Sequence, residues 1–516
     1  MATHEETALS YSAALRPVPG QQRAEADSRP QLADIGRLGR RLLRRAVSAA
    51  RADERSPQHV LASHLGQAAA ELPVARALWR GYDHVNVQAG LDAWLAQAGR
   101  EHEIVGLTGF QHEQFGLADL SQPSRWTSVG TGGVTTAARP SGPGGATRLC
   151  VQCALYLVSD SDGPLALLVH GPQEESPLES FSVEAACQDP ERGRQVIDEV
   201  RRLSVEHNVF RGHVIEFGAD LFGRAGTLLS FLDRPGVDRD QVILPPDVLD
   251  RIEAQVIGVA RHAGRLRASG QHLKRGVLLH GAPGTGKTHT IRYLLGQLPG
   301  VTVVLLSGDA LRLIGEACSV ARTLQPSMIV VEDVDLIAEE RERGLGMGAY
   351  PGFGMGAHPL LFQLLNEMDG LGEDLDVTFL LTTNRAELLE PALAQRPGRV
   401  DLAALLPLPD ADARRRLLRL YQGNLALDLA DADSMITRTE GVTASFIKEL
   451  LRRAALRAAE QAAQPDGARP LRVTDAHLGS ALDQLLDTRN QLTRVLLGGR
   501  RVPSSTGPED GTGSGG

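Results

Sequence analysis

The segment from Gly281 to Thr288 combines residue types that can bind a phosphate chain. It consists of Gly281, Ala282, Pro283, Gly284, Thr285, Gly286, Lys287 and Thr288, which is the spacing G-x-x-x-x-G-K-[ST]. The glycines let backbone N–H groups close around a phosphate without Cβ clashes. A predicted strand before this loop and a predicted helix after it direct the positive end of a helix at the same anion. We expect Lys287 to reach the β- and γ-phosphates and the Thr288 hydroxyl to bind Mg²⁺.

Lys287 is unusual in this chain, which uses arginine at almost every basic position. Of the 54 Lys and Arg residues, only Lys274, Lys287 and Lys448 are lysines. A lysine ammonium is a compact point charge, whereas the arginine guanidinium is a wide planar fork. The sequence therefore predicts a nucleoside triphosphate site, with ATP and Mg²⁺ as the cofactors.

A second polar element follows an apolar run over residues 326–331. Glu332 and Asp333 come directly after this predicted strand, at the end where ligands sit in an open parallel sheet. One carboxylate can hold the Mg²⁺ shell through water, and its neighbour can orient or deprotonate the attacking water. The residues alone leave open which of Glu332 and Asp333 takes the metal side, next to Thr288.

Three further segments complete a pattern that resembles the AAA ATPase module. They are residues 364–370, residues 380–384 and residues 391–401, in this order after the acidic pair. The resemblance covers roughly 240–490. It implies a homo-oligomeric ring, usually a hexamer, that binds ATP between subunits and hydrolyses it.

The resemblance also implies roles for three polar residues. Asn384 matches the polar sensor that positions the attacking water. Arg396 and Arg399 match the arginines that reach the neighbouring subunit's site, where a cation neutralises developing charge. Two residues separate Leu393 from Arg396 where the family pattern has one, so which arginine is the primary finger stays open.

Two departures from the family pattern bear on the mechanism. The acidic pair is Glu332-Asp333, where most of the family has Asp-Glu; this order resembles the branch that contains the mitochondrial translocase of the folded Rieske protein. Compared with the family's order, this exchange puts Glu332 on the metal side, where it acts through water, and Asp333 on the water side. Both charges remain, so we expect hydrolysis, with slow turnover. The axial pore loop is expected at residues 313–315, where Leu313 replaces the aromatic residue of substrate-threading members and offers less rigid contact area.

Residues 344–358 alternate glycine with apolar side chains that include Tyr350 and Phe353. Flexible backbone with soft apolar side chains suits the gripping of varied substrates, so this segment is a candidate second pore loop. A surface insert is the alternative.

The composition is that of a globular protein, with 42% hydrophobic and 23% charged residues. The net charge of −9 gives no reason to expect nucleic-acid binding by the whole chain. No apolar run reaches membrane-span length, so we expect no membrane span and a cytoplasmic location. Cys150 and Cys153 form a C-x-x-C on a predicted strand, where they face opposite sides and are poorly placed to share a metal.

The hydrophobic patterning predicts an α/β P-loop domain with a parallel sheet and a C-terminal helical lid, preceded by an α+β region. The expected divisions are a disordered tail over 1–30, a helical region over 31–121, an α+β recognition module over 122–240, the nucleotide-binding subdomain over 241–408, the helical lid over 409–497 and a disordered tail over 498–516. A basic amphipathic helix is expected within 31–52, and residues 58–120 are expected to be mainly helical.

The sequence thus predicts a ring ATPase that remodels a protein client. A slowly hydrolysing, ATP-gated assembly scaffold is the alternative, favoured by the reversed acidic pair and the missing pore aromatic. A nucleic-acid-handling ATPase has support from the arginine-rich stretch at 37–51 alone. No H-E-x-x-H occurs in the sequence, so no attached zinc protease is expected.

Overall fold

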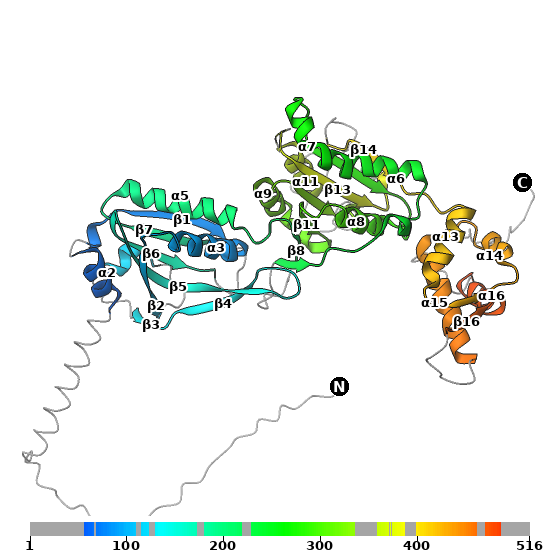
Figure 1. Ribbon diagram of the computed structural model, residues 1–516, viewed down its shortest axis with the longest axis horizontal. Helices are drawn as coiled ribbons and strands as arrows, with labels where there is room; N and C mark the ends of the chain where they lie inside the picture. Colours follow the sequence, from blue (N-terminus) through cyan, green and yellow to red (C-terminus); the bar gives the residue numbers. More distant parts are fainter. Residues whose placement is uncertain are drawn as a thin grey trace, which may run out of the picture.

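The computed structural model describes most of the chain between Ser56 and Leu486. The described residues are 56–66, 69–109, 115–122, 129–172, 180–218, 229–335, 359–370, 372, 374–387, 399–461 and 470–486. Figure 1 shows three successive groups of elements, with an α+β group first, a central sheet with its helices next, and a helical group last. The tails predicted over 1–30 and 498–516, and the basic helix predicted within 31–52, lie outside these residues.

The N-terminal group is built on a seven-stranded sheet whose main path is β1-β7-β6-β5-β2-β3, with β4 added along β5. Its strands are β1 (Val74–Arg80), β2 (Glu101–Thr108), β3 (Gly130–Gly132), β4 (Thr135–Pro140), β5 (Thr147–Asp160), β6 (Gly163–His170) and β7 (Ser180–Ala186). All of its strand pairs are antiparallel. Its helices are α2 (Pro57–Leu65), α3 (His84–Leu95), α4 (Leu117–Leu120) and α5 (Pro190–Glu206), with short 3₁₀ turns at Ala69–Glu71 and Gly81–Asp83.

Alternation along β5 gives this sheet two hydrophobic faces. Tyr156 and Val158 pack in one cluster with residues of α3 and α5. Leu155 and Leu157 point the other way and pack with residues of α2 and α4. A sheet with both faces covered needs this period-two division of a nearly continuous apolar strand.

The expectation that residues 58–120 are mainly helical is corrected by β1 and β2. β1 pairs antiparallel with β7 over its whole length, from Val74 opposite Ala186 to Arg80 opposite Ser180, and β2 pairs with β5. These partners lie far along the chain, so local periodicity could not reveal them. The α+β character predicted for the N-terminal region is confirmed, with β5, β6 and β7 followed by α5.

The central sheet has seven strands in the order β14-β10-β13-β12-β11-β8-β9. They are β8 (Val214–Phe217), β9 (Leu229–Leu232), β10 (Arg275–His280), β11 (Thr302–Leu306), β12 (Ser327–Val331), β13 (Val377–Thr383) and β14 (Leu402–Leu405). Neighbouring strands from β14 to β8 are parallel, and β9 pairs antiparallel with β8. The predicted α/β fold class with a parallel sheet is confirmed.

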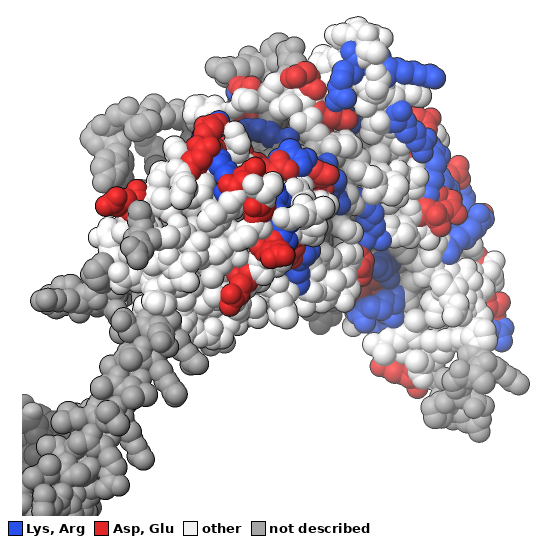
Figure 2. All heavy atoms as spheres, turned by 60° about the vertical axis from the view of Figure 1, so that its left-hand side comes forward, with Lys and Arg blue, Asp and Glu red and all other residues white. Residues whose placement is uncertain are grey.

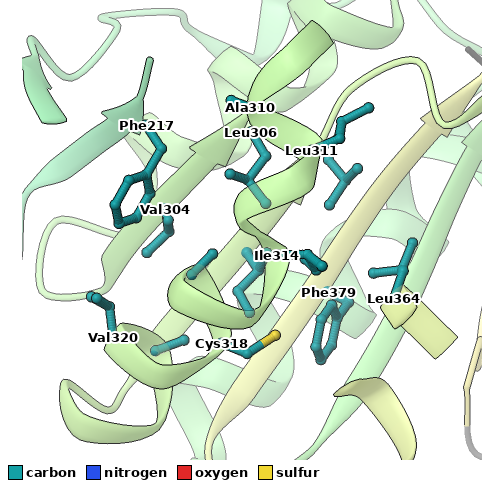
Figure 3. Close-up of a cluster of buried hydrophobic side chains, with 14 of the residues drawn as sticks. Phe217, Val304, Leu306, Ala310, Leu311, Ile314, Cys318, Val320, Leu364 and Phe379 are labelled. Carbon is teal, nitrogen blue, oxygen red and sulfur yellow. The ribbon is translucent and has the colours of Figure 1, made fainter. Parts of the chain in front are cut away.

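Helices cover both faces of this sheet. They are α6 (Pro246–Glu253), α7 (Val259–Ala268), α8 (Lys287–Gly296), α9 (Ile314–Thr323) and α11 (Pro359–Asp369), with a π turn at Ala254–Gly258 and 3₁₀ turns at Arg239–Gln241 and Gly308–Leu313. Residues of α6 and α8 pack on one face. Residues of α9 and α11 pack on the other, where Ile314 and Cys318 of α9 lie against Val304, Leu306 and Phe379 of the strands (Figure 3).

β8 belongs to the central sheet, which corrects its assignment to the α+β module over 122–240. Its register places Val214 beside Val303 and Phe217 beside Leu306 of β11. Val214, Ile215 and Phe217 are all buried there. Burial against β11 decides the position of this strand, although its sequence directly follows the last helix of the N-terminal group.

The C-terminal group is helical, as predicted. It contains α13 (Ala411–Gln422), α14 (Ala432–Arg438), α15 (Ala444–Gln461) and α16 (Asp475–Leu486), with a small parallel pair of β15 (Ala426–Asp428) and β16 (Arg472–Thr474). Asp410 and Asp431 cap α13 and α14 by accepting from backbone N–H groups of their first turns. The helices share a buried core of their own.

Candidate functional site

The predicted phosphate loop connects β10 to α8 at the carboxyl end of the central sheet. Gly284 and Gly286 have φ angles of 80° and 106°, a region that L side chains rarely adopt. A Cβ on Gly284 would also lie 2.9 Å from the Ser445 side chain of the C-terminal group. Glycine at both positions therefore allows the backbone to form an open cradle at the N-terminus of α8.

Lys287 points back into this loop. Its Nζ donates hydrogen bonds to the Gly281 carbonyl at 2.8 Å, the Ala282 carbonyl at 3.1 Å and Oδ1 of Asn384 at 2.7 Å. The residue is 7% exposed. Burial lowers its pKa, and the negative charges of Asp333 and Asp335 oppose this shift. A buried ammonium held by loop carbonyls marks the place where anionic oxygens would be favoured.

Asp333 and Asn384 continue this set of contacts across the strand ends. Nδ2 of Asn384 donates to Oδ1 of Asp333 at 3.2 Å, so Lys287, Asn384 and Asp333 form a connected series. The backbone N–H of Asp333 donates to Oγ1 of Thr382 at 2.9 Å. Asp333 has a φ of 53°, which is unusual for a residue with a side chain and is found at functional sites.

Glu332 lies at the end of β12 but outside this series. Its backbone N–H donates to the Leu306 carbonyl at 3.1 Å. Burial raises the pKa of its carboxyl, and the Asp333 and Glu216 carboxylates raise it further, while Arg292 lowers it. The two adjacent acids therefore occupy different environments, which suits two different roles.

Asp335 is a further polar residue at this site that the sequence reasoning did not assign. It is 5% exposed, and its Oδ1 accepts a hydrogen bond from the backbone N–H of Asn384 at 3.2 Å. This contact fixes the backbone from which the Asn384 side chain projects. A signal was present in the sequence, because Asp335 is the third acid in the run that begins at Glu332.

Arg399 is held by its own subdomain. Its guanidinium makes two hydrogen bonds to Asp369 at the end of α11, from Nε at 3.0 Å and from Nη2 at 2.7 Å. Its side chain is 7% exposed, and the hydrogen bond to Asp369 raises its pKa. The residue stands in a structural ion pair, which was not predicted. Arg396 lies outside the described residues.

The C-terminal helical group contacts the phosphate loop. The backbone N–H of Ser445, at the start of α15, donates to the Gly284 carbonyl at 3.2 Å. The Thr288 side chain, predicted to bind Mg²⁺, is exposed. The site is thus bounded by the loop, the strand ends of β12 and β13, and the first turn of α15.

The segment predicted as an axial pore loop does not project from the fold. Ile314 is 2% exposed and belongs to the buried cluster between α9 and the sheet (Figure 3), and Leu313 packs against the same cluster. The cause is a continuous path from the 3₁₀ turn at Gly308–Leu313 into α9, which leaves no free loop. The second candidate pore segment, 344–358, lies outside the described residues.

The described residues fit a nucleoside triphosphate with Mg²⁺. A glycine cradle, a buried lysine and a hydroxyl match the phosphates and the metal. Among these residues, no group of three or more His, Cys, Asp or Glu could hold a metal alone, and Mg²⁺ commonly needs phosphate oxygens to complete its shell. Within the same part of the chain, the helices are all too short or too polar to cross a membrane.

The comparisons with known proteins point to one family. The model of the ATPase family associated with various cellular activities (AAA) matches residues 277–408. The chain is similar to the ATP-dependent zinc metalloprotease FtsH of Mycobacterium leprae, with 33% identity over 242 residues, 45% of this chain and 29% of that protein. It is also similar to the human ATPase family gene 2 protein homolog A, with 32% identity over 240 residues, 45% of this chain and 26% of that protein.

A third relative is FtsH of Mycobacterium tuberculosis H37Rv, with 35% identity over 212 residues, 39% of this chain and 27% of that protein. The chain spans less than a third of the length of each of these three relatives. Together with the phosphate loop and the acidic strand end, these matches show that the chain carries an AAA ATPase domain at residues 277–408.

Proposed function

We propose that this protein binds and hydrolyses ATP within a homo-oligomeric ring, and that the ring, of hexameric size, remodels a protein client. The observation that carries the proposal is the series from Lys287 through Asn384 to Asp333, which links the phosphate loop to the acidic strand end. The names of the relatives support an ATP-dependent activity on proteins.

The proposed roles follow from these positions. The residues from Gly281 to Thr288 hold the phosphates, and Thr288 and Glu332 hold Mg²⁺, the latter through water. Bound Mg²⁺ would neutralise charge that develops on the phosphate oxygens. Asp333 and Asn384 orient the attacking water, because their side chains are already hydrogen-bonded to each other.

The two arginines receive different roles in this proposal. Arg399 is committed to Asp369 through two hydrogen bonds, so it organises its own subdomain. Arg396 is the primary finger for the neighbouring subunit's site. An arginine supplied in trans contributes about 10³-fold or more to turnover.

A slowly hydrolysing, ATP-gated scaffold is the second candidate. The burial of Ile314 favours it, because a ring without a projecting loop at residues 313–315 has no grip there on a threaded chain. Stimulation of turnover by an unfolded protein favours remodelling, whereas unchanged turnover together with ATP-dependent assembly favours the scaffold.

The proposed location is the cytoplasm, and nucleic acid is not among the proposed partners. On the face drawn in Figure 2, acidic and basic side chains are intermixed, and arginines of α5 pair with acids of the same helix. A nucleic-acid partner would require a broad basic surface and binding that weakens steeply with salt. Titration of duplex DNA at two salt concentrations tests this.

The decisive experiment is the ATPase rate per subunit against protein concentration. We expect the rate to rise with concentration and to fall to background in Lys287→Ala, while Arg396→Ala loses about 10³-fold in the assembled protein. Lys274→Ala is the matched lysine control, because Lys274 precedes β10 and lies outside the phosphate loop. Nucleotide binding without turnover in the wild type would leave the scaffold as the function.

Arg399→Ala separates the roles of the two arginines. We expect this variant to lower the thermal stability of the subunit, because Asp369 loses its partner. Mixing its subunits with Lys287→Ala subunits tests for a finger. Lys287→Ala subunits keep their arginines, so they restore turnover at the intact phosphate loops of a variant that lacks only the finger. A gain of turnover on mixing with Arg396→Ala but not with Arg399→Ala supports the assignment, and the reverse pattern contradicts it.

A further inference from the structure

The N-terminal sheet meets the central domain at a junction formed by Arg80, Tyr82, Asn86, Phe217 and Glu316. The hydroxyl of Tyr82 donates to Oε2 of Glu316 at 3.1 Å, and Nη2 of Arg80 lies 3.1 Å from Oε1 of the same carboxylate. Glu316 is in the first turn of α9. Both oxygens of one α9 carboxylate are therefore held by residues at the end of β1, namely Arg80, its last residue, and Tyr82, which follows it.

The junction is also apolar. The Tyr82 ring meets Phe217 of β8 edge-on, with ring centroids 5.5 Å apart. Val85 of α3 and Cys150 of β5 belong to the same buried cluster as residues of α9. One hydrophobic core thus continues from the N-terminal group into the central domain. A large, apolar contact between two groups opposes their relative motion.

The connection between the two groups has little slack. α5 ends at Glu206 and β8 begins at Val214. Between them, the Val209 N–H donates to Oδ1 of Asn86 at 2.9 Å, and the Gly212 N–H donates to Oγ1 of Thr302 at 3.0 Å. The connector is thereby bonded to α3 on one side and to β11 on the other, which is unlike a flexible linker.

A crevice beside the junction is too small to separate the two groups. Its volume is about 220 Å³, and its lining includes Trp79, Asp83 and Arg201 on one side and Ser319 and Thr323 of α9 on the other. Pockets for small-molecule ligands usually measure about 300–1,000 Å³. The crevice is therefore a packing gap in a continuous contact, and it supports no separate ligand site.

The junction is attached to an element that touches the catalytic strand. α9 packs against β11 and β12, and β12 ends at Val331, directly before Glu332. Since protein interiors are closely packed, a shift of the central domain must carry α9 and everything fixed to it.

We propose that the N-terminal α+β region is a fixed arm of the ATPase subdomain, so that nucleotide-driven rotation of the subdomain moves whatever the arm holds. The driving motion rests on the function proposed above, whereas the rigid attachment does not. This arrangement transmits force outside the axial pore and does not need a projecting loop at residues 313–315.

The experiment measures one intrasubunit distance by double electron–electron resonance in the full chain. Spin labels replace Arg194 on α5 and Arg251 on α6, whose side chains are 62% and 60% exposed. Cys153→Ser provides the background, because the other cysteines are buried. Labelled subunits are diluted with unlabelled ones, and samples contain no nucleotide, ADP or a non-hydrolysable ATP analogue.

We expect one narrow distance distribution that is the same in all three nucleotide states. A shift of the peak between states, or a broad distribution in the wild type, would overturn the fixed arm. Glu316→Ala should broaden the distance distribution more than the control variant Arg76→Ala. Arg76 lies on β1, as Arg80 does, but it pairs with Glu184 inside the N-terminal sheet and not with α9. Equal widths of the distance distribution in the two variants would show that Glu316 does not hold the N-terminal group against α9.

The ATPase rate of the same samples separates the two proposals. A constant distance in a protein without turnover would contradict the proposed function and leave the arm in place. Normal turnover with a nucleotide-dependent distance would support the proposed ATPase function and overturn the fixed arm.

Discussion

The two large sheets of this protein each have seven strands. They differ in the direction of those strands and therefore in which residues their strand ends bring together. Strands β14 to β8 of the central sheet run parallel, so the ends of β10, β12 and β13 meet at one edge. The phosphate loop, the acidic pair and Asn384 gather there. In the antiparallel N-terminal sheet, neighbouring strands end at opposite edges, and no comparable gathering occurs among its described residues.

Polar side chains in the N-terminal α+β group bind backbone N–H groups instead. Oε1 of Gln88 accepts from the Val151 N–H at 3.0 Å, and Oε2 of Glu184 accepts from the Leu117 N–H at 2.7 Å. Buried polar groups that satisfy backbone donors stabilise a fold without providing chemistry. The comparison teaches that strand direction decides which of the two sheets can carry an active site.

The largest difference between the two sheets is expected in the turnover of Asp333→Asn compared with that of Glu184→Gln. Removing the charge at the strand end of β12 should lower turnover by about 10²–10⁴-fold, as expected for loss of a general base, with ATP binding retained. Glu184→Gln should leave the rate per folded subunit unchanged. Steady-state turnover and fluorescent-nucleotide binding measure both. Equal losses in the two variants would refute the division of roles.

A stability test comes second. Leu167 is fully buried in the N-terminal sheet, so Leu167→Ala should destabilise the protein by about 2–5 kcal/mol. The nucleotide affinity of the folded fraction should not change. Urea unfolding followed by circular dichroism and nucleotide binding measures the two quantities. A weakened affinity in fully folded protein would show that the N-terminal core shapes the site directly.

Asp335→Ala should have a smaller effect on turnover. This carboxylate positions the Asn384 backbone, and a displacement of about 1 Å at a catalytic group costs about 10²-fold. The loss should fall on kcat with KM nearly unchanged, because the phosphate loop is intact. A rise in KM alone would assign Asp335 to nucleotide binding, and Asp335→Asn should recover part of the rate.

The smallest expected effect is a shift in pH dependence. Burial raises the pKa of Glu332, Arg292 lowers it and Glu216 raises it. Because the metal-competent form is the carboxylate, turnover should fall as pH decreases through this raised pKa. Arg292→Ala should move the acid limb to higher pH and Glu216→Gln to lower pH, measured as single-turnover rate against pH. Shifts in the same direction would exclude Glu332 as the titrating group.

Much of the candidate site could be predicted because its signals are local. The phosphate loop, the acidic pair and Asn384 each stand at the end of a short apolar run that forms a strand, and a parallel sheet brings such ends together. Asp335 and Asp369 were missed as site residues. Their roles depend on hydrogen bonds to Asn384 and Arg399, and these contacts follow from packing.

The sequence by itself determined the residue types of the nucleotide site, the α/β class and the helical C-terminal group, because glycine spacing and hydrophobic periodicity are properties of short segments. Only the tertiary structure decided that β1 is a strand beside β7, that β8 joins the central sheet, that Ile314 is buried and that Glu316 binds Tyr82 and Arg80. These outcomes depend on partners far along the chain, whose burial and pairing outweigh local preference.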